Sequence, residues 1–258
     1  MKSDQLIDIH CHILPDLDDG AKNIDQALAL AQQAYQQGIS TIIATPHYIE
    51  GTVETNPEEI TQACQQLTAK LKAQQIELTI QTGQEVYLSP DTALHYQEGK
   101  ILTLAQSSYL LIELPMHQYP LWVEESLYEL TLLGLRPILA HPERYREFRK
   151  STKELHQLAA SGLLMQINAG SILGQYGSKV EAQAEKLLEE GLISFIGSDA
   201  HSPQNRPIQI SQALTKLQTW GLEPQKLIAN NHAIIKGEEP PYLIKKEKSW
   251  WKKIWAFS

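Results

Sequence analysis

The chain has 258 residues, of which 42% are apolar and 20% are charged, a composition typical of a globular protein with a sizeable core. Its formal net charge of -8 excludes a general electrostatic attraction to nucleic acid, and two cysteines are too few for a disulfide framework. The sequence has no long apolar window and no signal-peptide pattern, so we expect a cytoplasmic protein without a membrane-spanning helix.

Seven short apolar runs rich in Ile, Leu or Val occur along the chain. They cover residues 5–10, 39–45, 76–82, 109–114, 136–141, 164–169 and 193–198. Several of them lack a strict alternation of apolar and polar residues, which is typical of strands buried on both faces.

Longer segments with helical spacing separate these runs. They cover residues 24–38, 56–75, 121–134, 151–162, 178–191 and 206–221. Asn56 and Pro57, followed by two glutamates, favour a helix start, and four of the helical segments end in a glycine before the next strand. The alternation predicts a parallel α/β sheet with right-handed crossovers, either closed into a barrel or open and doubly wound. No internal domain boundary is apparent.

Side chains that bind metals stand at or just after the carboxyl ends of six of the seven predicted strands. They are His10, His12, Asp18, Asp19, His47, Glu85, Glu113, His141, Asp199 and His201. Because the carboxyl ends of parallel barrel strands meet on one face, we expect these side chains to converge. Imidazoles and carboxylates together suit Zn, Mn or Fe, and their number exceeds what one ion needs. The pattern therefore predicts a site for two or three ions.

The cysteine between the first two histidines has a different expected role. The strand period of two places His10 and His12 on one face and Cys11 on the other. A cysteine-based phosphatase would also need an arginine six positions after its cysteine, where this chain has Leu17 and Lys70. We therefore expect Cys11 and Cys64 to be small buried residues.

Seven motifs between residues 6 and 237 carry a family resemblance. They are "DIHCHILPDLDDGAKN", "TIIATPHY", "TGQEVYL", "LLIELP", "PILAHPERY", "NAGSILG" and "FIGSDAHSPQNRP". Together they resemble the polymerase and histidinol phosphatase (PHP) superfamily, and more closely its bacterial protein-tyrosine phosphatase branch of capsular and exopolysaccharide synthesis. The resemblance implies a distorted seven-stranded (β/α)7 barrel over residues 1–240. It also implies a phosphotyrosine phosphatase with three divalent metal ions, Mn first, with Fe or Zn as alternatives.

The resemblance implies a role for each site residue. One ion would be held by His10, His12, Glu85 and Asp199. Glu85 would bridge to a second ion, shared with Glu113 and His141. A third ion would be held by Asp19, which is preferred over Asp18, together with His47 and His201. Arg144 and Arg206 would bind the phosphate while a metal-bridging hydroxide attacks phosphorus.

The implied substrate is a phosphotyrosine protein, which we expect to be a membrane-associated bacterial tyrosine kinase that regulates polysaccharide export. A PHP-type small-molecule phosphoesterase such as histidinol phosphatase is the alternative. A metal-dependent amidohydrolase also opens on a His-x-His strand, but it usually has a bridging lysine, and no lysine ends a predicted strand here. The intact ligand set argues against a non-enzymatic barrel.

Other polar residues have weaker assignments. We expect Asn168 to serve the turn in "NAGS", with lining of the pocket as the alternative. We also expect Asp8 to support His10, and Glu143 either to orient its neighbours or to be solvated. Ordinary packing is preferred over substrate contact for Tyr48, Tyr87 and Tyr145. Structural or surface roles are expected for His95, His117, His156 and His232.

The segment 241–258 forms a basic tail. Its last fifteen residues hold five lysines, one glutamate and three of the five tryptophans. This composition suits contact with an anionic membrane surface, and the segment is too short and too charged to span. A solubilising tail, or one that packs on the barrel, is the alternative. Contact would place the protein at the inner membrane face.

Overall fold

The computed structural model describes residues 5–116 and 118–242. Its strands are β1 (Leu6–Cys11), β2 (Ile39–Ala44), β3 (His47–Ile49), β4 (Val53–Glu54), β5 (Thr79–Thr82), β6 (Glu85–Tyr87), β7 (Tyr109–Glu113), β8 (Arg136–Ala140), β9 (Leu164–Asn168) and β10 (Phe195–Gly197). Each of the seven predicted runs overlaps one of these strands. β3, β4 and β6 are additional.

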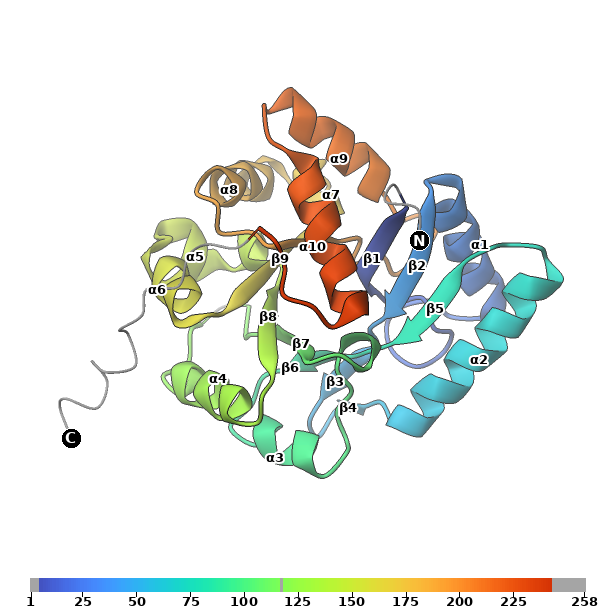
Figure 1. The fold of residues 1–258 in the computed structure, drawn as a ribbon, viewed down its shortest axis with the longest axis horizontal. Helices are drawn as coiled ribbons and strands as arrows, with labels where there is room; N and C mark the ends of the chain where they lie inside the picture. Colours follow the sequence, from blue (N-terminus) through green and yellow to red (C-terminus); the bar gives the residue numbers. More distant parts are fainter. Residues whose placement is uncertain (1–4, 117, 243–258) are drawn as a thin grey trace.

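Most of the helices lie around the outside of the strands, and α10 lies across one end of the barrel (Figure 1). They are α1 (Ile24–Gln36), α2 (Pro57–Ala73), α3 (Thr92–Gln97), α4 (Val123–Leu132), α5 (Arg146–Lys150), α6 (Lys153–Ser161), α7 (Ala169–Ile172), α8 (Ser178–Glu189), α9 (Ile210–Thr219) and α10 (Pro224–Lys236), with 3₁₀ turns η1 (Leu104–Gln106) and η2 (Pro142–Arg144). All six predicted helices are present, and α3, α5, α7 and α10 were not predicted. At α2 the expected start is confirmed, because Asn56 is the N-cap, forms a capping box with Glu59 and is followed by Pro57 in the first helical position.

The strands occupy seven positions around a barrel. One sheet has the order β1-β2-β5 and the other β10-β9-β8-β7-β6-β3-β4, with every pairing parallel except β3 with β4. β2 and β3 are consecutive parts of one extended segment that changes sheet at Pro46, and β5 and β6 change sheet at Gly83 in the same way. A bridge between Cys11 and Ala200 closes the ring between β1 and β10. The predicted seven-stranded barrel is confirmed, and these two breaks are its distortion.

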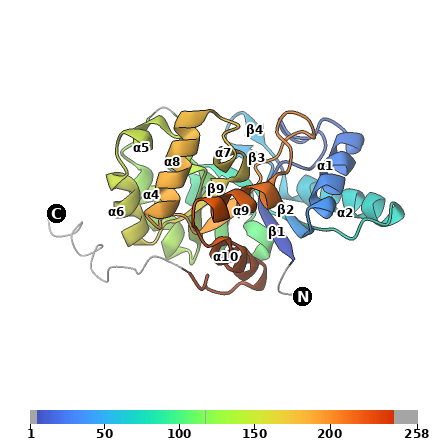
Figure 2. The same cartoon turned by 90° about the horizontal axis from the view of Figure 1, so that it is seen from above.

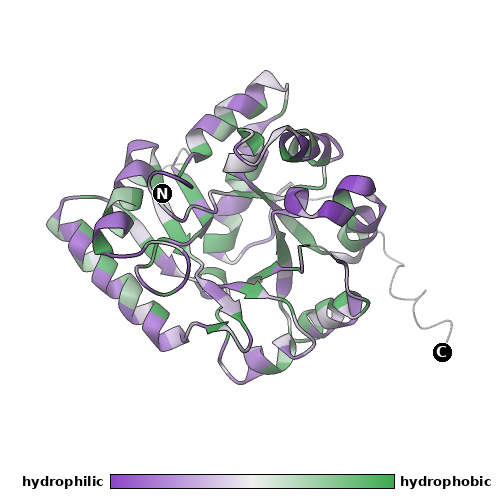
Figure 3. Cartoon of the chain, turned by 180° about the vertical axis from the view of Figure 1, so that it is seen from behind, coloured by the Kyte–Doolittle hydropathy of each residue, from purple (hydrophilic) through white to green (hydrophobic). Residues whose placement is uncertain are grey.

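Apolar residues fill the barrel and the layer between strands and helices. Figure 3 shows hydrophobic strands inside helices of mixed hydropathy. The inner cluster includes Ile9, Leu111 and Phe195, and it also contains Ile234 of α10. The side chain of Asn231 donates to the carbonyls of Ile7 and Ile196, so α10 covers the amino ends of the strands. Figure 2 shows α10 at one end of the barrel and β3 and β4 toward the other, where the candidate site lies.

No helix among the described residues is long and apolar enough to cross a membrane. The predicted division at residue 240 is not tested, because residues 243–258 lie outside the described part of the chain. The predicted membrane contact of the tail falls on the same residues.

Candidate metal centre

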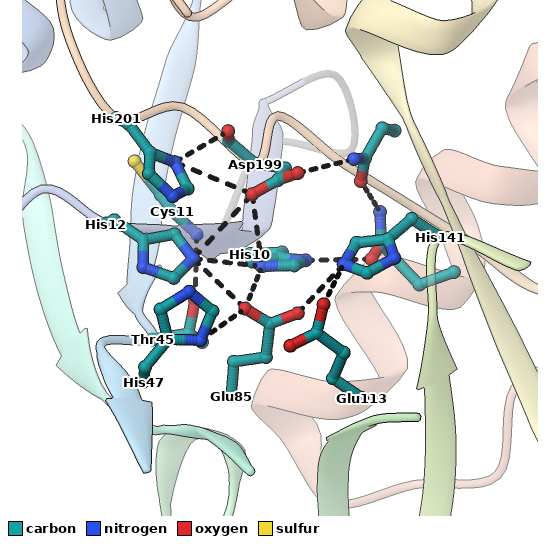
Figure 4. Close-up of polar contacts among 12 residues, drawn as sticks. His10, Cys11, His12, Thr45, His47, Glu85, Glu113, His141, Asp199 and His201 are labelled. Carbon is teal, nitrogen blue, oxygen red and sulfur yellow. Dashed lines mark hydrogen bonds and ion pairs between the residues drawn. The ribbon is translucent and has the colours of Figure 1, made fainter. Parts of the chain in front are cut away.

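Nine predicted ligands meet at the carboxyl end of the barrel. Figure 4 shows eight of them, and Asp19 lies beside His47 and His201. Three groups bring ligand atoms close enough to share an ion: His12, Asp19, His47 and His201; His10, His12 and Glu85; and His47, Glu85 and Glu113. Residues separated by 191 positions in the sequence, from His10 to His201, thus surround one small volume, as the parallel topology predicts.

The deepest group surrounds a common point. The Nε2 atoms of His10 and His12 lie 3.2 Å apart, and Oε2 of Glu85 lies 3.3 Å from both. Oδ1 of Asp199 lies 3.5 Å and 3.7 Å from the same nitrogens. Three donors bound to one ion at tetrahedral angles and ordinary metal–ligand lengths would lie about 3.4 Å from one another. The spacing of His10, His12 and Glu85 fits such an ion, and Asp199 lies beside the two imidazoles.

Glu85 faces two groups at once. Its Oε2 lies 3.1 Å from Nδ1 of His47 as well as near His10 and His12, whereas its Oε1 lies 3.0 Å from Nε2 of His141. The same nitrogen of His141 lies 3.7 Å from Oε1 of Glu113. Glu85 is 1% exposed, so both oxygens are directed by the protein rather than by solvent. This arrangement suits a carboxylate that bridges two ions.

The outer group opens to solvent. Oδ1 of Asp19 lies 3.3 Å from Nε2 of His201 and 3.6 Å from Nε2 of His47. The Asp19 side chain is 66% exposed, whereas the deeper ligands are buried. The centre is therefore reached from the side of Asp19.

The two neighbouring aspartates have separate positions. Asp18 turns inward, where Oδ2 accepts a 2.6 Å hydrogen bond from Nδ1 of His12 and another from the backbone N–H of His47. Its Oδ1 accepts from the N–H of Gly20, a position where a Cβ would lie 2.6 Å from Cβ of His12. Asp18 thus orients the His12 ring with Nε2 toward the site. Asp19 is the aspartate that faces His47 and His201.

Gln166 on β9 orients the His10 ring in the same way, and the sequence analysis missed it. Nδ1 of His10 donates to Oε1 of Gln166 at 2.9 Å, which leaves Nε2 free to face the site. Nε2 of Gln166 then donates to Oδ1 of Asn168 at 3.0 Å. The only local signal was a polar residue inside the apolar run "LMQINA".

The expected turn role of the Asn168 side chain was wrong, because this side chain faces the metal centre. Its side-chain nitrogen donates a 2.5 Å hydrogen bond to Oδ2 of Asp199, and the residue is fully buried. Because the end of β9 faces the barrel mouth, this amide reaches the site instead of bonding its own turn.

The two predicted phosphate-binding arginines meet on that same oxygen. Nη1 of Arg144 lies 3.0 Å and Nη2 of Arg206 lies 2.5 Å from Oδ2 of Asp199. Their side chains are 25% and 26% exposed, so both guanidiniums are reachable from the site opening. Asp199 therefore offers Oδ1 to the imidazoles and Oδ2 to the arginines.

Two site residues adopt backbone angles that L-residues rarely populate. His141 has φ +38° and Asp199 has φ +52°. Such strain costs free energy and persists where the surroundings hold it, often at functional sites. Both residues stand where a strand ends and the chain turns across the barrel mouth.

The buried charges perturb the titration of the ligands. Burial, with the neighbouring carboxylates Glu85 and Asp199, raises the pKa of Glu113 to about 8. Burial lowers the pKa of His141 to about 4, so this imidazole is neutral and able to bind a metal at neutral pH. Several carboxylates crowded in a buried site without enough cations are costly. Divalent cations would offset this repulsion, so the donor set fits metal ions.

The cysteine prediction is confirmed. Cys11 and Cys64 are both buried, and burial raises the pKa of Cys64 to about 12 and that of Cys11 well above its ordinary value. Neither thiol is placed as a nucleophile, since that role needs an exposed thiolate.

The remaining polar residues have structural partners. Oδ1 of Asp8 accepts from the backbone N–H groups of His10 and Ser198, so Asp8 supports His10 through its backbone and not through its ring. Glu143 is fully buried and accepts from the N–H of Asn168, which excludes the solvated alternative. Tyr48 and Tyr145 are buried, and Tyr87 is partly buried in β6, as expected for packing. His95, His156 and His232 contact Tyr48, Glu190 and the Gln5 carbonyl, respectively, and His117 lies outside the described residues.

Comparisons with known proteins place the chain in a family. Residues 6–235 match the family model described as "Capsular polysaccharide synthesis, CpsB/CapC". The chain is 36% identical to the tyrosine-protein phosphatase YwqE of Bacillus subtilis over 249 residues, which cover 94% of this chain and 98% of that relative.

Solved structures agree with this result. The fold matches a crystal structure from work on YwqE of B. subtilis and CpsB of Streptococcus pneumoniae, which are described as metal-dependent tyrosine phosphatases. The TM-score is 0.87, and the sequences are 36% identical over 93% of this chain and all of that one. Histidinol phosphate phosphatase of Lactococcus lactis shares the fold, with a TM-score of 0.56 and 17% identity over 85% of this chain and 95% of that one. The chain belongs to the CpsB/CapC capsular polysaccharide synthesis family, within the PHP superfamily that its motifs resemble.

Proposed function

We propose that this protein is a metal-dependent protein-tyrosine phosphatase of capsular polysaccharide synthesis. The observation that carries the proposal is the convergence of nine metal-binding side chains beside Arg144 and Arg206, in a chain of the CpsB/CapC family. Metal ligands and guanidiniums on one face suit phosphoryl transfer, because both stabilise the charge on the phosphoryl oxygens.

The geometry supports three divalent ions. His10, His12, Glu85 and Asp199 would hold the first, and Glu85, Glu113 and His141 the second. Asp19, His47 and His201 would hold the third, with His12 close enough to contribute. Mn suits this mixture of imidazole and carboxylate, and Fe or Zn are the alternatives. When bound, such ions supply an activated water at neutral pH and positive charge at the phosphoryl group.

The protein's own residues supply binding and orientation. Arg144 and Arg206 project planar guanidinium forks that can each donate two hydrogen bonds to phosphate oxygens. Because both already contact Asp199, the phosphate site and the metal site share one carboxylate. The leaving group is a tyrosine phenolate, whose conjugate acid has a pKa of about 10, so a strong general acid is less necessary than for a serine ester.

The proposal extends to the identity of the substrate and to the location of the protein in the cell. The substrate would be a phosphotyrosine protein, namely a membrane-associated bacterial tyrosine kinase. The basic, tryptophan-rich segment 241–258 would bring the phosphatase to the anionic inner membrane face. Histidinol phosphatase activity remains the second candidate, which the shared barrel supports at the level of fold alone.

A comparison of substrates tests the proposal. The Mn-loaded protein should hydrolyse a phosphotyrosine peptide with a kcat/KM well above that for the matched phosphoserine peptide and for histidinol phosphate. Preference for histidinol phosphate would replace the proposed substrate while keeping the metal site. The absence of hydrolysis of all three by metal-loaded protein would contradict phosphatase activity.

A further inference from the structure

Tyr176 stands between the two arginines and has no assigned role. The guanidinium carbon of Arg144 lies 4.8 Å from the centre of its ring. Its hydroxyl lies beside the side chain of Arg206, close enough to interact with that guanidinium. One tyrosine thus contacts Arg144 through its ring face and Arg206 through its oxygen.

The backbone around Tyr176 holds it in that position. The N–H of Gln175 donates to the carbonyl of Gly170, and a Cβ at Gly170 would lie 3.2 Å from Cε2 of Tyr176 and 2.3 Å from Oε1 of Gln175. The absence of a side chain at Gly170 therefore leaves space for the side chains of Gln175 and Tyr176. Gln175 also donates through Nε2 to the carbonyl of Asn205, the residue before Arg206. The loop carrying Tyr176 is tied to the loop carrying Arg206.

The arginines need such a support. Both guanidiniums approach Oδ2 of Asp199, so two like charges lie close together and about a quarter of each side chain is exposed. Long side chains in this situation lose rotamer freedom and repel each other when they converge. The ring face attracts the Arg144 guanidinium, and the hydroxyl oxygen beside Arg206 is able to accept from the other guanidinium. Both interactions favour the converged arrangement before any phosphate arrives.

We propose that Tyr176 is a positioning residue that holds Arg144 and Arg206 together for the phosphoryl group of the substrate. This inference rests on the proposed function, in which the arginines bind phosphate. Tyr176 acts through the arginines, so its effect should appear in phosphate and substrate binding and not in metal content.

Two substitutions separate the two contacts. Tyr176→Phe keeps the ring and removes the hydroxyl, and it should raise KM for a phosphotyrosine peptide and the inhibition constant of inorganic phosphate roughly fivefold. Tyr176→Leu removes both contacts and should raise them roughly tenfold or more. Tyr35→Phe, on exposed α1, is the matched control and should change neither constant.

A double-mutant cycle decides whether Tyr176 acts through Arg206. The phosphate inhibition constant is measured for Arg206→Ala and Arg144→Ala, each with and without Tyr176→Phe. The effect of Tyr176→Phe should vanish beside Arg206→Ala and persist beside Arg144→Ala. Bound Mn and the unfolding midpoint should match the wild type in both Tyr176 variants.

The possible results distinguish a failure of the proposed phosphate site from a failure of the positioning role of Tyr176. If neither arginine substitution weakens phosphate inhibition, the proposed phosphate site is wrong, and the role of Tyr176 falls with it. If the arginine substitutions weaken it but Tyr176→Phe adds its full effect beside Arg206→Ala, the arginines stand and the positioning role is overturned. Loss of Mn or of folding in Tyr176→Phe would also overturn it, because the residue would then support the barrel.

Discussion

The side-chain amide of Asn168 donates a 2.5 Å hydrogen bond to Oδ2 of Asp199 at the buried edge of the metal centre. Arg144 and Arg206 contact the same oxygen, so three donors meet there while Oδ1 faces His10 and His12. The contacts on Oδ2 thereby fix the orientation of the Asp199 carboxylate, with Oδ1 toward the metal ligands. These contacts also help to hold the strained positive φ of Asp199.

Asn168→Ala should weaken metal binding and turnover together. Without its amide, Asp199 loses one of its three donors, and we expect about a tenfold loss in Mn affinity or kcat. Titration of metal-free protein with Mn by calorimetry, together with kcat on a phosphotyrosine peptide, measures both. Wild-type values for both quantities would mean that Asn168 serves its turn alone.

Gln166→Leu should lower Mn affinity by about tenfold or more, because the ring of His10 loses the acceptor that fixes Nδ1 as the donor. Gln166→Glu keeps an acceptor at the same place and should retain more of the affinity. Gln65→Leu, on an exposed position of α2, is the matched control. Equal Mn affinity in Gln166→Leu and the control would remove Gln166 from the support of the site.

Glu143 should make the metal-free protein less stable as pH rises. Burial raises the pKa of its carboxyl from 4.5 to about 7 in the folded protein. Between these values the unfolded chain releases the proton that the folded chain keeps, so the stability present below pH 4.5 is lost as pH rises through 7. The loss amounts to about 3 kcal/mol.

Urea unfolding of metal-free protein at pH 5 and pH 8 measures this effect in the wild type and in Glu143→Gln. The glutamine variant cannot ionise at this position, so its stability should fall less between the two values. Parallel pH profiles would show that Glu143 ionises in the folded protein much as it does in the unfolded chain.

Deletion of residues 245–258 should abolish binding to anionic liposomes and leave peptide hydrolysis in solution unchanged. The expectation follows from the lysines and tryptophans of this segment, since such side chains favour an anionic interface. Co-sedimentation with phosphatidylserine vesicles measures binding, with neutral vesicles as the control. Failure of the intact protein to bind the anionic vesicles would contradict a membrane role.

Much of the site could be predicted because its ligands follow a topological rule. His10 and His12 share a strand face by the period of two, and parallel strands bring their carboxyl ends together, so His141 and Asp199 could be placed near them. The same rule does not predict the residues that orient the ligands through hydrogen bonds. Gln166 is a lone polar residue in an apolar strand, and only its partner across the barrel reveals its role.

The unpredicted elements also have physical reasons. α10 carries Asn230 and Asn231 on its buried side, where their amides donate to the carbonyls of Ser194 and Ile7, so its apolar stripe is interrupted. The splitting of two barrel strands depends on Pro46 and on the tight packing of Gly83 against Ile43, which are tertiary features. Tyr176 has no local signal, since its partners lie on two other loops.

The central claim is that bound metal, and no cysteine, carries phosphotyrosine hydrolysis at this site. Its most direct test is phosphate release from a phosphotyrosine peptide, measured with Mn, after chelation, after Mn is restored, and after alkylation of thiols with iodoacetamide. We predict that chelation abolishes release, that Mn restores it and that alkylation has no effect. Release that survives chelation and is lost on alkylation would contradict the account.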